Sequence, residues 1–202
     1  MPLRVLDAAN LGVSLGEVLE AVSRGYERVH VPVQGSSGVS MVCTAALDAL
    51  EESFEIMSEH SLGERLRRGE HALRTGDFVS EKELAEELGL AFAPDAGGMV
   101  ALAAPGATPA GGTAARWRLV TGRPAKDALV GVHERERAEL WRFVTGTLLV
   151  DPDRCGIELV GDLAPRLLAR VAGYRVIYRT DTIQHAVRLI DIHPWTFVHL
   201  AR

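Results

Sequence analysis

Hydrophobic and polar residues follow each other in the first part of the chain with the spacings of helices and strands. Apolar residues recur every three or four positions over 10–24, as on one face of a helix, and a glycine follows them. Strict alternation over 28–34 predicts a strand, which the glycine-rich turn 35–38 joins to a second strand over 39–43. With a short strand over 3–6, these segments predict a small α/β unit.

Helical spacing continues beyond this unit, over 45–59, 61–74 and 81–88. Ser61 and Ser80 are each followed three residues later by a glutamate, a pattern typical of a helix start. The first of the three helices carries an apolar stripe, which fits a core or dimer contact or a stem that grips a partner: Leu47, Leu50, Phe54 and Met57. The third carries an acidic run, which fits a solvated helix or a cover for cations elsewhere: Glu81, Glu83, Glu86 and Glu87.

The second part of the chain begins after a stretch, residues 93–115, that is rich in Ala, Gly, Pro and Thr and has no periodicity. We expect this stretch to be a linker. A strand is predicted over 116–120 and a helical hairpin over 124–149, and four strand-like segments follow: 157–160, 167–171, 174–179 and 186–192. This order predicts an α+β layer, one antiparallel sheet with two helices on one face, and so a domain over 116–202 that follows a domain over 1–92.

Charge divides the chain at nearly the same place. Residues 1–114 hold 8 Lys and Arg against 17 Asp and Glu, whereas residues 115–202 hold 14 against 10. We therefore expect the two parts to attract each other, with the acidic part able to compete for a polyanion-binding surface on the basic part.

Composition excludes several classes of protein. Cys43 and Cys155 stand far apart and outside any Cys/His cluster, so neither a disulfide framework nor a metal site is expected. The sequence also contains no apolar run of membrane-spanning length, and it begins with neither a basic leader nor an apolar signal core. We expect a cytoplasmic protein without a cofactor or a membrane partner.

Residues 1–89 resemble the Phd/YefM antitoxin family in the order strand, helix, hairpin with the sequence GYERVHV, and then the helical segment LDALEESFEIMSEHSLGERLRRGEHALRTGDFVSEKELAEELG. The resemblance implies an N-terminal domain that forms a homodimer and binds operator DNA. It also implies that the helices after this domain wrap a toxin.

Residues 116–202 resemble the RelE/ParE toxin superfamily, and within it YoeB-like toxins, through LVGDLAPRLLARVAGYRVIYRTDTIQHAVRLIDIH. Members with nuclease activity cut messenger RNA on the ribosome without a metal, whereas the ParE branch poisons DNA gyrase. The residues that match functional positions of the family are three arginines and two histidines of the tail: Arg166, Arg170, Arg175, His193 and His199.

Cleavage of RNA through its 2′-hydroxyl needs a base, cations for the charge that develops on phosphorus, and an acid for the leaving oxygen. Arginine supplies only the cations, because it is effectively never deprotonated. His193 and His199 are therefore the candidates for proton transfer.

The resulting hypothesis is a fused, self-neutralised toxin–antitoxin pair whose toxin half, if active, is a metal-independent endoribonuclease. Its partners would be itself, messenger RNA on the ribosome and operator DNA. Two alternatives remain open: a non-enzymatic DNA-binding or protein-binding regulator with a degenerate toxin fold, and a ParE-like gyrase inhibitor.

Overall fold

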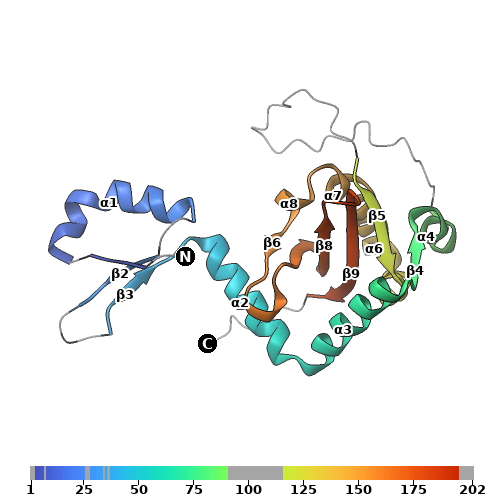
Figure 1. The fold of residues 1–202 in the computed structure, drawn as a ribbon, viewed down its shortest axis with the longest axis horizontal. Helices are drawn as coiled ribbons and strands as arrows, with labels where there is room; N and C mark the ends of the chain where they lie inside the picture. Colours follow the sequence, from blue (N-terminus) through green and yellow to red (C-terminus); the bar gives the residue numbers. More distant parts are fainter. Residues whose placement is uncertain are drawn as a thin grey trace. The chain divides into compact units, whose positions relative to one another are not determined.

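The computed structural model describes residues 3–6, 8–25, 28–33, 35, 37–90 and 116–195, and the side chains of all of these except 8–14 (Figure 1). The fold is α+β, as predicted. It divides into two compact units, Met1–Glu55 and Ile56–Arg202. The predicted linker and His199 lie outside the described residues.

The first unit pairs a small sheet with one helix. Strand β1 (Leu3–Val5) runs parallel to β2 (Arg28–Val31), and β2 runs antiparallel to β3 (Val39–Met41). Helix α1 (Ala8–Ser23) places Val18 and Val22 against the valines of β2. Helix α2 (Thr44–Ser58) begins in this unit and ends in the second. The predicted elements of this part are all present.

The second unit is built on a six-stranded sheet in the order β4-β5-β9-β8-β7-β6. Its strands are β4 (Phe78–Ser80), β5 (Arg118–Gly122), β6 (Ile157–Glu158), β7 (Leu167–Val171), β8 (Tyr174–Asp181) and β9 (Ala186–Pro194). The prediction of a purely antiparallel sheet is wrong, because β5 runs parallel to β9. Strand β4 was not predicted, and it adds an edge to the sheet from the earlier part of the chain.

In the described part of this unit, the helices after α2 are α3 (His60–Thr75), α4 (Glu81–Leu88), α5 (Arg123–Val130), α6 (Glu134–Arg142), α7 (Leu148–Val150) and α8 (Pro152–Cys155). The predicted helical hairpin is α5 and α6, which continues through a π-helical turn, Phe143–Thr147, into α7. The capping box at Ser80 is confirmed. Ser61 does not cap α3, which begins one residue earlier, after Glu59.

The two faces of the sheet are covered by different parts of the chain. On one face, Val176 and Tyr178 of β8 and Val187 of β9 pack with α5, α6 and α7, and α4 joins them. On the other face, Leu168, Ile177 and Ile190 pack with apolar residues of α3 and the end of α2: Ile56, Leu62, Leu66 and Leu73. The predicted pair of helices therefore covers one face, and α3 covers the other (Figure 1).

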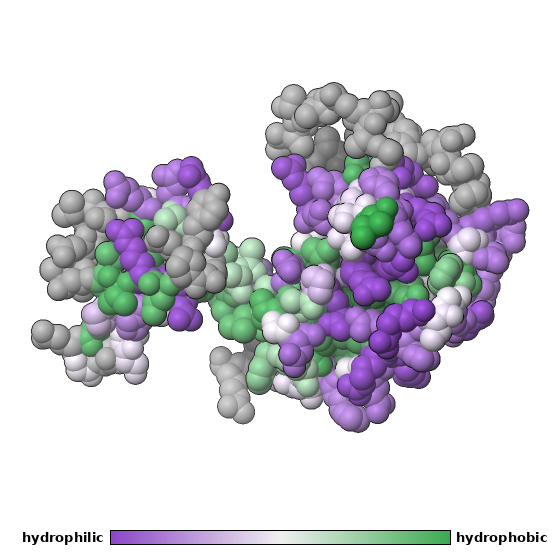
Figure 2. All heavy atoms as spheres, viewed as in Figure 1, coloured by the Kyte–Doolittle hydropathy of each residue, from purple (hydrophilic) through white to green (hydrophobic). Residues whose placement is uncertain are grey.

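The compact units do not follow the charge division of the sequence. Residues 56–90 fold with residues 116–195, although the resemblance assigns these segments to different halves. The division into 1–92, 93–115 and 116–202 stays a prediction about family origin. No helix in the described part of the chain is long and apolar enough to span a membrane. Figure 2 shows a mainly hydrophilic surface on the second unit in this view, with green patches between.

Candidate functional site

Three of the predicted site residues share one face of the sheet. Arg175 of β8 is paired in register with His193 of β9 and with Arg170 of β7. Side chains of residues paired in register point to the same side of a sheet. Ile177 lies two residues after Arg175 and packs on the α3 side, so Arg170, Arg175 and His193 also face that side. Register therefore brings these three residues to one face, and their assignment to a functional site stays a prediction.

Acidic residues of the preceding segment reach two of the candidates. The Nε of Arg166 donates to Oε1 of Glu70, in α3, over 2.7 Å, and its Nη1 donates to the carbonyl of Asp162 over 2.9 Å. The Nε2 of His193 lies 3.8 Å from Oε1 of Glu59, the residue before α3. Helix α3 and its first flanking residue thus engage the predicted site with carboxylates.

Of the remaining candidates that the structure describes, Arg175 is buried and Arg170 is exposed. Arg175 is only 2% exposed. The guanidinium of Arg170 lies over the ring of Trp195, 4.6 Å from its centroid, in a cation–π contact. This contact accounts for the position of Trp195 directly after β9.

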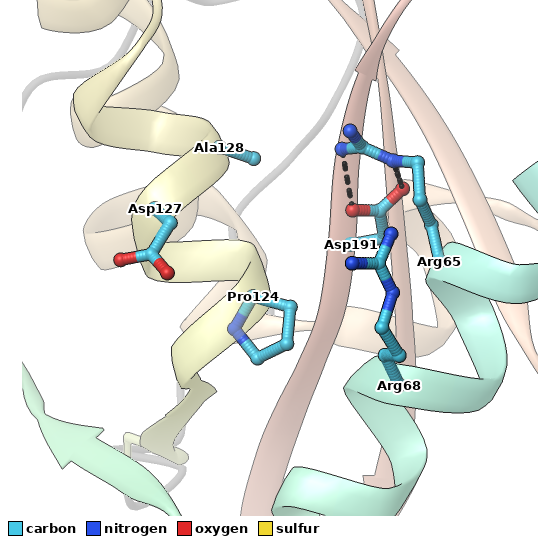
Figure 3. A pocket seen from close by; sticks show the side chains of 6 residues that line it. All are labelled: Arg65, Arg68, Pro124, Asp127, Ala128 and Asp191. Atoms are coloured by element: carbon cyan, nitrogen blue, oxygen red, sulfur yellow. Dashed lines mark hydrogen bonds and ion pairs between the residues drawn. The ribbon is translucent and has the colours of Figure 1, made fainter. Parts of the chain in front are cut away.

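A buried carboxylate, which the sequence did not single out, lies within the same site. Asp191 precedes His193 by two residues in β9, is paired with Ile177, and is 1% exposed. Arg65 of α3 donates to it twice, from Nη2 over 2.8 Å and from Nε over 3.1 Å, and Nη2 also donates to the carbonyl of Ile192 over 2.9 Å. Figure 3 shows this pair beside a pocket of about 330 Å³ between α3 and α5, which Arg68 and Asp127 also line.

Burial and neighbouring charge alter proton binding at both β9 residues. Burial raises the pKa of Asp191, and the hydrogen bond from Arg65 opposes the rise. Burial lowers the pKa of His193, and the positive charge of Arg65 lowers it further, against Glu59 and Asp191. The Nδ1 of His193 is buried and has no hydrogen-bond partner among the described residues. His193 is therefore held toward its neutral form.

A glycine allows α3 to approach the sheet closely. A Cβ added at Gly69 would lie 2.2 Å from the carbonyl oxygen of Ile190. Ile190 is the extra residue of a bulge in β9, because Ile177 is paired with Asp191 and Tyr178 with Leu189. Gly69 lies four residues after Arg65, so the same face of α3 contacts the bulge and the carboxylate beside it.

Further ion pairs join β4, α4 and the turn before them to residues 116–195. Arg116 donates to Glu81 over 2.6 Å, Lys126 to Glu87 over 2.8 Å, and Arg123 to Asp77 over 2.6 Å. The acidic run of α4 thus covers cations, but these are not the predicted site arginines. Glu83 instead closes the capping box at Ser80, with Ser80 N donating to it over 2.8 Å.

The ion pair between Glu70 and Arg166 neutralises a cation beside the predicted site, and α3 packs on the same face of the sheet. Both features can oppose the binding of an anionic ligand. Within the described residues, no group of three His, Cys, Asp or Glu could hold a metal ion. The sequence missed Arg65, Gly69 and Asp191. Helical periodicity placed the first two in a helix, but nothing local to them indicated which strand they meet.

The chain is similar to known proteins in structure, whereas no sequence family matches it. Neither protein-family models nor curated proteins match the sequence. Among solved structures, the chain is similar to a chain in the crystal structure of the toxin–antitoxin complex RelBE2 from Mycobacterium tuberculosis. The identity is 26%, the match covers 39% of this chain and 98% of that chain, and the TM-score is 0.38.

Proposed function

We propose that the chain is a self-neutralised toxin–antitoxin fusion, in which residues 56–90 act as a mask on a toxin sheet formed by residues 116–195. The observation that carries the proposal is the position of α3. It lies on the sheet face that bears Arg170, Arg175 and His193, and it contributes the carboxylate that pairs with Arg166.

The proposed activity of the toxin half is metal-independent cleavage of messenger RNA on the ribosome. Arg166, Arg170 and Arg175 would stabilise the charge that develops on the phosphate, and His193 would accept the proton of the 2′-hydroxyl. Masking by α3 prevents this, because the phosphate would need the space that α3 and Glu70 occupy. His199 stays a second candidate for proton transfer.

Fusion strengthens the mask. A tethered segment meets its target at an effective concentration on the order of millimolar, so even a weak interface stays closed. The exposed stripe of α2, which includes Leu47, Leu50 and Phe54, supports a further contact with a second copy of the chain. We propose a homodimer through the first unit, and operator DNA as the ligand of that dimer.

A growth assay tests this function. Induction of residues 116–202 alone should arrest growth, whereas the full chain should not, and Arg175→Ala in the shorter piece should restore growth. Co-expression of residues 1–92 should also restore growth. The two pieces should copurify, which would show that the toxin piece is folded. Normal growth with a folded, copurifying toxin piece would contradict the proposal.

A second candidate is a regulator with a degenerate toxin fold. The near-complete burial of Arg175 favours it, because a residue enclosed this way also serves as part of a structural core. Operator binding by the full chain without cleavage of ribosome-bound messenger by the toxin piece would select this candidate. Inhibition of supercoiling by the toxin piece would instead select a gyrase inhibitor.

A further inference from the structure

The ion pairs between residues 56–90 and residues 116–195 have one exception in their polarity. Four carboxylates of the earlier segment pair with Arg or Lys on the later one: Glu70, Asp77, Glu81 and Glu87. Between Arg65 and Asp191 the charges are exchanged. The overall charge difference between the two parts of the chain therefore explains the other pairs and leaves this one unexplained.

The burial of the Asp191 carboxylate also costs free energy. A carboxylate that is 1% exposed loses its hydration, and an apolar residue of similar size would cover the sheet without that cost. Among the described residues, the side chain that donates to it is Arg65 of the mask, and the backbone N–H of Ile192 in β9 bonds to it as well. If the carboxylate only served folding of the sheet, a charged partner within the sheet would be expected, whereas its charged partner is Arg65 of α3.

Its neighbours on the face give it a chemical use. Asp191 and His193 are two residues apart in one strand, so their side chains lie side by side, and Arg175 is paired with His193. A carboxylate beside an imidazole stabilises the protonated ring and so strengthens it as a proton acceptor. The Nε2 of His193 faces Glu59, which belongs to the mask, so departure of the mask exposes this nitrogen.

We propose that Asp191 is a positioning residue for His193 in the toxin site, and that Arg65 withholds it while α3 is in place. This inference rests on the proposed function. In the reaction, the 2′-hydroxyl gives its proton to Nε2 of neutral His193 and its oxygen bonds to phosphorus. The bond from phosphorus to the 5′-oxygen breaks, that oxygen takes a proton from water, and the hydroxide so formed takes the proton from the His193 imidazolium. Asp191 stabilises the imidazolium that forms.

The mask therefore inhibits in two ways. It covers the face, and through Arg65 it both neutralises Asp191 and adds a positive charge near His193, which lowers the pKa of that ring. Simple steric cover would need only the apolar residues of α3. In the Arg65–Asp191 pair the cation lies on α3 and the carboxylate lies on the sheet. This is the arrangement needed for α3 to neutralise the carboxylate.

The test uses the full chain with the mask loosened by one methyl group. In Gly69→Ala the added Cβ collides with the carbonyl of Ile190, whereas in Gly63→Ala, in the same helix, the nearest atom is the end of the Arg67 side chain at 3.7 Å. In Gly69→Ala, the α3 amides should exchange faster than in the unchanged chain, and the amides of α5 and α6 should exchange at the same rate. In Gly63→Ala, exchange should be unchanged in all three helices. Expression of Gly69→Ala should arrest growth, and Gly63→Ala should not.

Asp191 is then changed in this open background. The double variant Gly69→Ala with Asp191→Asn should permit growth. It should cut messenger RNA on ribosomes at least roughly 10-fold more slowly than Gly69→Ala alone. Gly69→Ala with Asp191→Glu should keep part of the activity. Titration of the His193 ring by NMR should give a lower pKa with Asn than with Asp at position 191. Equal growth arrest with Asp and Asn would overturn the inference.

Other outcomes separate this inference from the proposed function. Normal growth of Gly69→Ala with α3 open by hydrogen exchange would refute the proposed function, while the NMR titration would still test the Asp191–His193 coupling. A second background, Leu66→Asp, loosens α3 by placing a charge among buried apolar residues. If the α3 amides stay protected from exchange in both Gly69→Ala and Leu66→Asp, the proposal that α3 is a removable mask would be refuted.

Discussion

The two faces of the large sheet are closed by different kinds of contact. The face under α5, α6 and α7 is closed mainly by apolar residues of the same part of the chain, of which Leu140 and Leu148 are fully buried. The face under α3 is closed by fewer apolar residues, together with the pairs Arg65–Asp191 and Glu70–Arg166. Apolar burial alone is sufficient for the first face, whereas the second carries charges that need partners.

This difference indicates which cover can be removed. Taking away the helices of the first face would expose a continuous apolar surface, which is unfavourable in water. Taking α3 away would expose a smaller apolar surface and a set of charged side chains that water can solvate. The first cover is therefore part of the fold, and the second has the composition of an interface.

The largest effects should come from apolar truncations, one on each face. Leu140→Ala and Leu66→Ala each remove a buried side chain and should cost about 2–5 kcal/mol. In Leu140→Ala the loss should appear in the global unfolding of the second unit by chemical denaturation. In Leu66→Ala it should appear first as local exchange of α3 amides. Similar exchange patterns in the two variants would mean that the two covers do not differ.

The next effect concerns the buried ion pair. Arg65→Gln leaves Asp191 without its charged partner and should destabilise the unit by about 2 kcal/mol, somewhat less than the loss of a fully buried pair because Arg65 keeps contact with solvent. Arg65→Gln with Asp191→Asn should recover most of this, measured in a double-mutant cycle. Arg68→Gln on the next part of α3 is the control and should change little.

A smaller effect is expected at the start of α4. Ser80→Ala removes the hydroxyl that accepts from the Glu83 amide and should cost about 1 kcal/mol in thermal unfolding. The matched control is Ser61→Ala in α3, because Ser61 bonds to the side chain of Glu59 and caps no amide. Equal losses at the two serines would contradict the assignment of the helix starts.

The smallest effect is a pH dependence confined to the α3 face. Arg65, Glu59, Asp191 and Arg175 all influence His193, and its pKa is lower in the folded chain than in the unfolded chain. The unfolded chain thus binds more protons near pH 6.5, so stability should fall as the pH falls through this value. The protection of the α3 amides, corrected for the intrinsic exchange rate at each pH, should fall between pH 7.5 and 5.5, and His193→Gln should abolish the change.

Local sequence patterns predicted most of the elements. A strand-like apolar run identified 167–171, and the Ser80–Glu83 pattern with its following apolar spacing identified 81–88. Strand β4 was missed because three residues carry too little periodicity, and its stability comes from pairing with β5, some forty residues later in the chain. The parallel pairing of β5 with β9 is a matter of topology that local spacing does not encode.

The site was predictable in part for the same reason. The matches to the toxin superfamily selected Arg170, Arg175 and His193, which register brings to one face. Arg65 and Asp191 are separated by 126 residues, and their meeting depends on which face α3 covers. The contact of Gly69 depends on the bulge at Ile190, which no sequence pattern announced.

The most direct test of the proposed mask asks which segment binds the sheet of residues 116–195. Residues 116–202 are co-expressed with either residues 56–92 or residues 1–55, and the bound fraction is measured after purification. The account predicts a one-to-one complex with residues 56–92, with the α3 amides protected from exchange, and no complex with residues 1–55. A complex with residues 1–55, and none with residues 56–92, would contradict it.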